Sequence, residues 1–284
     1  MFQEDIIIVV EENKKNFDSG IKKGKLLVFG GVYSNLQALE ALRRWAFENN
    51  YQSENIFCTG DVLGYCAQPL ECIECIKDWG IQCIAGNVEL QIRNNLDDCG
   101  CDFSEGVRCD MFSKNWYAFA KSKMNEASFS WLNSLPDHIQ FKYGNKKIFL
   151  VHGSYPDISA FIFKSTPPEI KATVLKQTNA DIIIAGHCGL PFADHIENKI
   201  WLNAGAIGMP ANDGTARVWF LTLDTDEKDI FNCSFHSLTY DHPLTAQFML
   251  QNHLPESYAK TLSTGIWDNC EILPEKETQL QGLK

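Results

Sequence analysis

The stretch Phe57–Tyr65 constrains the fold of this chain more than any other part of its sequence. An apolar run ends at Thr59-Gly60, presents the carboxylate of Asp61, and meets a second glycine at Gly64. In α/β proteins, an acidic side chain placed in this way lies in the crevice beyond the carboxyl end of a strand, where ligands bind. Asp61 is therefore a candidate functional residue, although Gly-Asp pairs also form ordinary turns.

Three more polar residues stand in the same position relative to an apolar run. Asn87, His152 and His187 each follow a predicted strand and, like Asp61, each adjoins a glycine. One carboxylate, one amide oxygen and two imidazoles form a suitable ligand set for a divalent transition metal such as Mn, Fe, Zn or Ni. Each residue alone is compatible with a structural role, but four of them at strand-to-loop switch points favour a metal site.

Strands and helices are predicted to alternate along most of the chain. Strands at 26–29, 56–58 and 81–85 are separated by a helix that Ser34-Asn35 cap and by a helix at about 69–79. This order predicts a mainly parallel sheet of βαβ units. Further helices are predicted at about 111–123, 126–133 and 167–178, and from about 242. A second series of strands is predicted at 139–143, 147–151 and 181–185. The segments 192–196, 199–203, 216–223 and 230–236 are expected to be antiparallel strands that close the second sheet.

The domain organisation expected from this pattern is simple. Residues 1–24, with a short apolar strand candidate at Ile6–Val10, form an N-terminal extension or an added edge strand. Residues 25–240 form one α/β domain. Residues 241–284 form a C-terminal helical segment and a tail that pack on the same domain.

Composition excludes several classes of function. The formal net charge is -11 and no block of Lys or Arg stands out, which argues against nucleic-acid binding as the main role. No apolar stretch is long enough to cross a membrane, and no signal peptide is visible, so we expect a cytoplasmic protein. Its eleven cysteines are then expected to be reduced, and most of them to be small buried hydrophobic residues.

The order of the motifs resembles the calcineurin-like metallophosphoesterase family, and in particular its branch of small bacterial phosphodiesterases and phosphatases. The matching motifs are Gly60-Asp61-x-x-Gly64-Tyr65, Gly86-Asn87, Val151-His152-Gly153, Gly186-His187-x-x-x-Pro191-Phe192 and Asn203-x-Gly205-x-x-Gly208-x-Pro210. The resemblance runs from about Lys25 to Leu223. It implies an α/β fold, a four-layer α/β/β/α sandwich of two mixed sheets. It also implies two metal ions bridged by a hydroxide, which attacks a phosphorus atom in line.

The chain departs from the family at one of these two metal positions. The family's Asp-x-His-Gly-Asn is replaced by Gly31-Val32-Tyr33-Ser34-Asn35, and the closing Gly-His-x-His ends at Gly189. By resemblance, one metal position keeps the ligands Asp61, Asn87, His152 and His187. The other keeps only the bridging Asp61, because Asp is lost at 31 and His at 33 and 189. Val88 replaces the histidine that would steady the transition state or protonate the leaving group. We therefore expect one metal site, with the second in doubt.

Two functions compete for this pattern. The leading hypothesis is a metal-dependent hydrolase of small phosphate esters, with Asp61, His152 and Tyr33 as catalytic candidates. Its candidate substrate-binding residues are Asn35, Arg93 and Asn203, although Arg93 also fits a solvated helix face. The alternative is a catalytically impaired pseudoenzyme that binds a ligand or regulates a partner on the same fold.

Cysteine thiolates offer a further set of metal ligands. Cys188 lies inside the altered closing motif, and Cys99 and Cys101 lie in the loop that follows Asn87. Sulfur ligands would favour zinc or iron over manganese. Against this, the spacing of these residues is not typical of zinc sites, and buried structural thiols are the favoured explanation.

Overall fold

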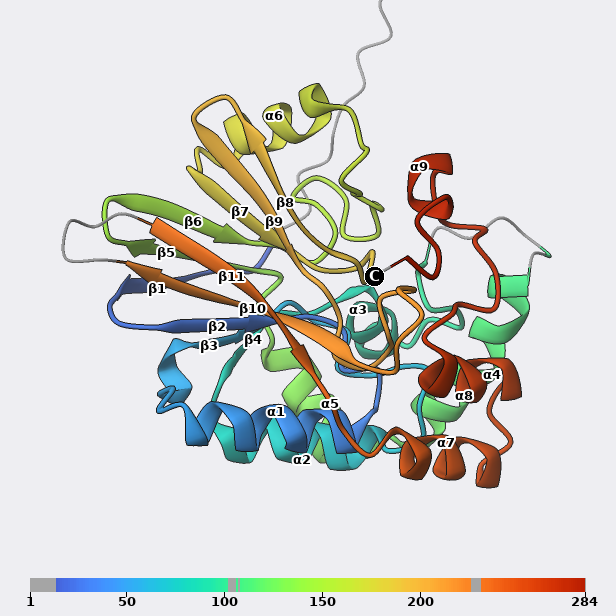
Figure 1. Cartoon of the computed structure of the whole chain (residues 1–284). Coiled ribbons are helices and arrows are strands. Elements are labelled where there is room, and N and C mark those ends of the chain that lie inside the picture. Colours follow the sequence, from blue (N-terminus) through green and yellow to red (C-terminus); the bar gives the residue numbers. More distant parts are fainter. Residues whose placement is uncertain (1–13, 102–105, 107, 226–230, 284) are drawn as a thin grey trace, which may run out of the picture.

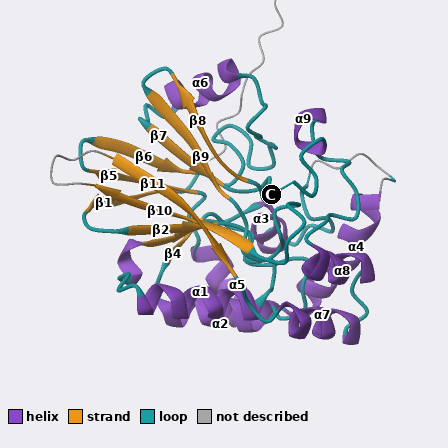
Figure 2. Cartoon of the chain, viewed as in Figure 1, coloured by secondary structure: helices purple, strands orange, loops and turns teal. Residues whose placement is uncertain are grey.

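Two mixed β-sheets packed face to face form the centre of the protein, with helices on both outer faces (Figures 1 and 2). The computed structural model describes residues 14–101, 106, 108–225 and 231–283. The predicted strand Ile6–Val10 lies outside the described residues. In spatial order, the six-stranded sheet contains β1 (Asn16–Lys22), β5 (His138–Tyr143), β6 (Lys146–Leu150), β7 (Ile182–Ala185), β9 (Lys199–Ala204) and β8 (Pro191–Ile196). The five-stranded sheet contains β11 (Phe231–Leu238), β10 (Val218–Thr225), β2 (Leu26–Phe29), β3 (Ile56–Cys58) and β4 (Gln82–Cys83).

Alternation of apolar side chains along the strands explains why each sheet is covered on both faces. Leu26 and Val28 of β2 join a hydrophobic cluster that lies between the two sheets. Leu27 and Phe29, which point the other way, join the cluster beneath the helices. Strand β7 divides its side chains between two clusters in the same manner. Because successive side chains point to opposite faces, continuous apolar runs belong to strands buried on both sides.

Helices complete the predicted four-layer sandwich, which the structure confirms. Helices α1 (Leu36–Glu48), α2 (Pro69–Trp79), α4 (Arg108–Lys123) and α5 (Glu126–Ser134) contribute to the cluster outside the five-stranded sheet. Helix α6 (Pro168–Gln177) covers the six-stranded sheet (Figure 1). The remaining elements are α3 (Asn87–Arg93), α7 (His242–Gln251), α8 (Glu256–Thr264), α9 (Glu275–Thr278) and the 3-10 turn η1 (Ser53–Asn55). Among the described residues, no helix is long and apolar enough to cross a membrane.

The placement of the last strands differs from the sequence-based expectation. Strand β10 pairs antiparallel with β2, and β11 pairs with β10, so both extend the first sheet and not the second. Strand β9 pairs parallel with β7, and β8 pairs antiparallel with β9. Leu221 and Leu223 of β10 enter the inter-sheet cluster beside Val28. An alternating pattern predicts such burial, but it does not say which of two sheet edges a strand will join.

The segments at the two ends of the domain pack on it in different ways. Strand β1 runs parallel to β5 at the edge of the six-stranded sheet, and its Phe17 and Ile21 side chains are exposed. Met249 of α7 and Leu262 of α8 are buried in the same hydrophobic cluster as Leu39 of α1. All eleven cysteines are free thiols and eight are buried, as predicted.

His138 is expected to make the protein sensitive to acid. Its side chain is buried against Phe149 and Tyr155, and neither ring nitrogen has a hydrogen-bond partner in the described structure. Burial, together with the charge of Lys14, lowers the pKa of His138 from 6.5 to about 4, while Asp137 opposes the shift. Between pH 6.5 and 4 the unfolded chain binds the extra proton, so stability falls as the pH falls through this window.

Replacing His138 with phenylalanine should remove this sensitivity. Lowering the pH from 7 to 4.5 reduces the free energy of unfolding of both proteins. We expect this reduction to be about 2–3 kcal/mol smaller in the variant than in the wild type. Urea denaturation at the two pH values measures the difference. The exposed His253 provides a control, and His253→Asn should follow the wild type. An unchanged acid response in His138→Phe would contradict the assignment.

Candidate metal centre

Four polar side chains meet where strands of both sheets end. Asp61 follows β3 and Asn87 follows β4, both in the five-stranded sheet. His152 follows β6 and His187 follows β7, both in the six-stranded sheet. The carboxyl ends of parallel strands lie at the same edge of a sheet, and here the corresponding edges of two sheets face each other. The structure therefore brings together all four residues that the sequence predicts as metal ligands.

His152 lies at the centre of this cluster. Its Nε2 atom is 3.2 Å from Asp61 Oδ2, 2.9 Å from Asn87 Oδ1 and 3.0 Å from His187 Nδ1. Ligand atoms of Asp61, His152 and His187 all lie within 4.8 Å of one another. All four side chains are buried. Distances of this order suit one ion held among the four groups.

The backbone conformation places the ligands at some energetic cost. Asp61 has φ 54° and His187 has φ 61°, a region that residues other than glycine rarely adopt. Gly86 allows the β3 and β4 loops to approach, because a Cβ atom there would lie 2.1 Å from Asp61 Oδ1. Strained backbone of this kind persists only where the surroundings enforce it, and it concentrates at functional sites.

Hydrogen bonds orient the ligand atoms toward one another. The carbonyl oxygen of Thr59 lies 2.7 Å from His152 Nδ1, so Nδ1 carries a proton and Nε2 faces the cluster. Asn87 donates its amide to the carbonyl oxygen of Cys99 at 2.8 Å, which turns its Oδ1 toward His152. His187 Nε2 is buried without a hydrogen-bond partner in the described structure.

The charge balance of the cluster calls for a cation or a proton. Burial lowers the pKa of His152, but Asp61 outweighs this effect and the net pKa is raised. Burial and the neighbouring His152 lower the pKa of His187 to about 3, so that this imidazole is neutral at pH 7. Converging acceptor atoms repel one another unless a positive charge lies between them. The oxygen and nitrogen donors that converge here, His187 Nδ1 among them, fit a divalent transition metal.

Glu89 supports this site and was not predicted from the sequence. Its carboxylate accepts hydrogen bonds from the backbone N–H groups of Asp61 (2.8 Å), Leu63 (3.0 Å) and Gly86 (2.8 Å). Burial, followed by the charge of Asp61, raises the pKa of Glu89 to about 7. Glu89 thus ties the Asp61 loop to the start of α3. An acidic residue in the first helical turn after Gly86-Asn87 is the signal that could have identified it.

Tyr33 occupies the space of the missing second set of ligands. A Cβ atom at Gly31 would lie 2.4 Å from Cζ and 2.7 Å from Oη of Tyr33. A Cβ atom at Gly189 would lie 3.9 Å from the same phenol oxygen. Burial, with a contribution from Asp61, raises the pKa of Tyr33 well above its ordinary value, so the phenol stays protonated. An aromatic ring therefore stands between two positions at which the family resemblance expects metal ligands.

The cysteines do not join the cluster. Cys101 Sγ lies 3.3 Å from the amide nitrogen of Asn87, and Cys188 Sγ lies 3.2 Å from that of Asn203. Among the His, Cys, Asp and Glu side chains that the structure describes, the one group able to hold a metal is Asp61, His152 and His187. Burial raises the pKa of Cys188 to about 12, which keeps it a neutral thiol at pH 7. The predicted thiolate ligands Cys188, Cys99 and Cys101 thus lie outside this group, and Asn87 contacts the backbone carbonyl of Cys99.

The three predicted substrate-binding residues lie outside the cluster. Arg93 pairs with Asp137 at 2.8 Å, far along α3 from the strand ends. Asn35 caps α1 by accepting from the Ala38 N–H, and it is fully buried. Asn203 donates to the carbonyl oxygen of Gly186 at 2.6 Å and so positions the loop that carries His187. Each of the three thus makes hydrogen bonds or an ion pair within the protein.

A pocket opens directly onto the candidate metal centre. Asp61 and His187 of the cluster line it, together with Tyr33, Phe161 and Met209. The C-terminal segment, which was expected only to pack on the domain, contributes further lining residues, namely Trp267, Asp268, Asn269 and Ile272. The sequence gives no periodic signal for such a loop. The one feature of the sequence that could have indicated this contribution is Trp267, a large aromatic residue in a polar tail.

Comparison with known proteins agrees with this geometry. The profile of the calcineurin-like phosphoesterase superfamily domain matches residues 31–228. The uncharacterized protein MJ0912 of Methanocaldococcus jannaschii is 28% identical over 263 residues, which cover 86% of this chain and 99% of that protein. Because the profile matches more than half of the sequence, the chain belongs to the calcineurin-like phosphoesterase superfamily.

Two solved structures share the fold. The hypothetical protein PH1004 from Pyrococcus horikoshii OT3 superimposes with a TM-score of 0.71 at 19% identity, covering 86% of this chain and 99% of that one. A metallophosphoesterase from Sphaerobacter thermophilus gives a TM-score of 0.65 at 22% identity, covering 86% of this chain and 100% of that one. The family and fold predicted from the motifs are thus confirmed, and membership supports the assignment to phosphoester hydrolases.

Proposed function

We propose that this protein is a metal-dependent hydrolase of small phosphate esters that works with one divalent transition metal. The proposal rests on one observation: Asp61, Asn87, His152 and His187 converge in a buried cluster, and Asp61 and His187 of this cluster line a pocket. Manganese, iron, zinc and nickel all suit this set of oxygen and nitrogen donors.

The chain's own groups have definable tasks in such a reaction. A divalent ion held by the four ligands would supply Lewis-acid polarisation of a phosphoryl oxygen and make water more acidic. The protonated Tyr33 phenol lines the pocket and can donate a hydrogen bond to a phosphoryl oxygen. Glu89 and the Thr59 carbonyl hold Asp61 and His152 in place through backbone contacts. Asp61 and His152 are therefore proposed as catalytic through their hold on the ion.

A pseudoenzyme that only binds a ligand is the second candidate, and the position of Tyr33 favours it. The phenol fills the space between Gly31 and Gly189, and Val88 offers no proton-transfer group beside the pocket. Losing such electrostatic groups lowers rates by about 100- to 1000-fold each in other enzymes. Binding without turnover would then remain.

Metal content and turnover together distinguish the two functions. Purified protein, reconstituted separately with Mn, Fe, Zn and Ni, should bind close to one equivalent of metal by elemental analysis. We expect it to hydrolyse bis(4-nitrophenyl) phosphate or 4-nitrophenyl phosphate faster than the metal-free protein does. Metal binding without turnover of either ester would favour the pseudoenzyme. Absence of stoichiometric metal under all four conditions would overturn the proposed centre.

A further inference from the structure

Aromatic side chains make up much of the pocket wall. Tyr33, Tyr65, Phe161, Tyr258 and Trp267 all line it, and together they come from four separate parts of the chain. The Phe161 ring centroid lies 4.3 Å from that of His187, so an aromatic face stands directly beside the ligand cluster. A planar group attached to a phosphate at the centre would therefore meet aromatic surface at once. Aromatic rings bind planar ligands through offset stacking and edge contacts.

The wall formed by Trp267 is held in place before any ligand binds. Its indole Nε1 donates to the carbonyl oxygen of Pro210 at 2.7 Å, and its backbone N–H donates to Asn212 Oδ1 at 2.8 Å. The same Asn212 receives a hydrogen bond from Gln281 and accepts another through its backbone carbonyl from Gly282. Because the segment is already ordered, a ligand that stacks on Trp267 need not supply the energy of ordering it.

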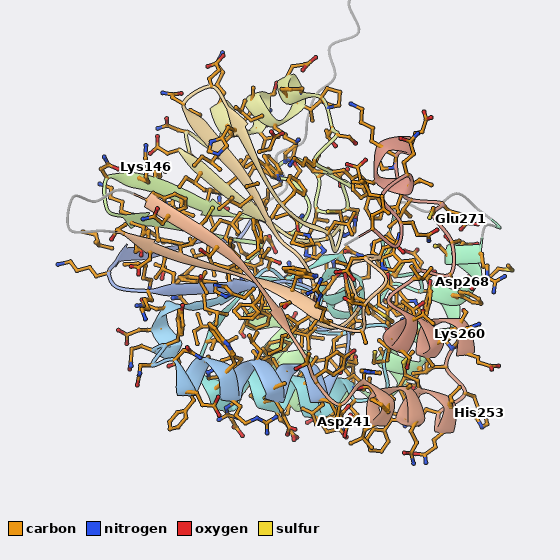
Figure 3. All side chains as sticks on the ribbon, viewed as in Figure 1. Lys146, Asp241, His253, Lys260, Asp268 and Glu271 are labelled. Atoms are coloured by element: carbon orange, nitrogen blue, oxygen red, sulfur yellow. The ribbon has the colours of Figure 1, made fainter. Side chains whose placement is uncertain are left out.

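The pocket lacks the cations that bind highly charged phosphates. No Lys or Arg is among its described lining residues, whereas Asp61 and Asp268 both line it. Figure 3 shows Asp268 on the C-terminal segment, near α4. Arg108 of α4 pairs with Asp268 at 2.9 Å, which uses its charge on a carboxylate.

Charge balance then selects among phosphate esters. Asp61 and Asp268 are the acidic residues that line the pocket, Glu89 lies behind Asp61, and the guanidinium of Arg108 is paired with Asp268. A divalent ion bound among these acidic groups would leave little excess positive charge, which suits a ligand with one negative charge better than a ligand with two. A phosphomonoester carries nearly two negative charges at pH 7 and is normally held by Arg or Lys side chains.

We propose that the pocket binds a phosphodiester with a single negative charge and a planar aromatic ester group, which stacks on Phe161 and Trp267. This inference rests on the proposed function for the position of the phosphate, and it adds the class of substrate. Nucleobases and simple aryl groups share the required chemistry. Phosphomonoesters and diesters without an aromatic group are the classes that this wall disfavours.

Equilibrium binding tests this selectivity independently of turnover. Isothermal titration calorimetry of the full-length protein as purified compares methyl phenyl phosphate with dimethyl phosphate, which lacks the ring, and phenyl phosphate, which has a second negative charge. We expect methyl phenyl phosphate to bind at least about tenfold more tightly than either, because one stacked ring is worth about that factor. The methyl ester of adenosine 5′-monophosphate shows which aromatic group the pocket prefers. Tighter binding than that of methyl phenyl phosphate assigns a nucleobase, and weaker binding assigns a simple aryl group.

Two variants give the structural control. Phe161→Leu, which keeps an apolar side chain but removes the ring, should reduce the preference for methyl phenyl phosphate over dimethyl phosphate about fivefold or more. Phe119→Leu, on α4 and not among the pocket-lining residues, should leave the preference unchanged. Equal binding of the methyl phenyl and dimethyl esters, or tighter binding of phenyl phosphate, would overturn the inference. Selective binding without turnover of bis(4-nitrophenyl) phosphate would contradict only the hydrolase proposal, and turnover without selectivity would contradict only this inference.

Discussion

Asp61→Asn is expected to lose stoichiometric metal and at least about 1000-fold in turnover of bis(4-nitrophenyl) phosphate. The carboxylate is the one anionic group among the four proposed ligands, and it lies 3.2 Å from His152 Nε2. Asparagine keeps the shape of the side chain and can keep the fold, because the contacts to Glu89 and Tyr33 use the backbone of residue 61. Elemental analysis and initial rates measure the two losses.

An exposed carboxylate provides the matched control for this variant. Asp97 lies on the surface, where it pairs with Lys121, and Asp97→Asn should keep the wild-type metal content. His187→Ala should behave like Asp61→Asn, since its imidazole contributes another of the grouped ligand atoms. Full metal content in both Asp61→Asn and His187→Ala would show that the ion, if bound, lies elsewhere. Urea denaturation separates loss of metal from loss of fold.

The proposed ligands were predictable because each follows a buried strand at a glycine. Asp61, Asn87, His152 and His187 are spread over more than a hundred chain positions, yet the strands before them end at facing edges of the two sheets. Glu89 escaped prediction because its role depends on three backbone N–H groups from two different loops. Such contacts exist only after the strands have assembled.

The pocket walls were less predictable than the proposed ligands for the same reason. Phe161 and Trp267 lie in loops, whose paths depend on tertiary hydrogen bonds such as that from Trp267 to Pro210. Strand β10 likewise carried the correct apolar alternation, but its choice of the edge beside β2 depended on the competing edges of both sheets. Periodicity therefore predicts the elements and the strand-end residues. Their lateral neighbours follow from packing between distant segments.

Rebuilding the lost ligands is expected to create a second metal site only if Tyr33 is also removed. In Gly31→Asp alone, the new Cβ would lie 2.4 Å from Tyr33 Cζ, so the phenol must move before the carboxylate can bind an ion. We expect this variant to keep about one equivalent of metal and to lose about 2 kcal/mol of unfolding free energy through overpacking. The triple variant Gly31→Asp/Tyr33→His/Gly189→His replaces the ring with a ligand, and it should bind about two equivalents.

The second ion should also increase turnover, since two adjacent metals can stabilise both the attacking and the leaving oxygen. We expect the triple variant to hydrolyse bis(4-nitrophenyl) phosphate roughly 100-fold faster than the wild type. Gly31→Asp/Tyr33→Phe is the matched control, because phenylalanine keeps the ring between Gly31 and Gly189 and should block the second ion. A second equivalent of metal in that control would show that the ring is no barrier. A folded triple variant with one equivalent of metal would show instead that the ring is not what keeps the second ion out. The backbone at Gly31 (φ 28°) or at Gly189 (φ 73°) would then hold the new side chains away from the second metal position.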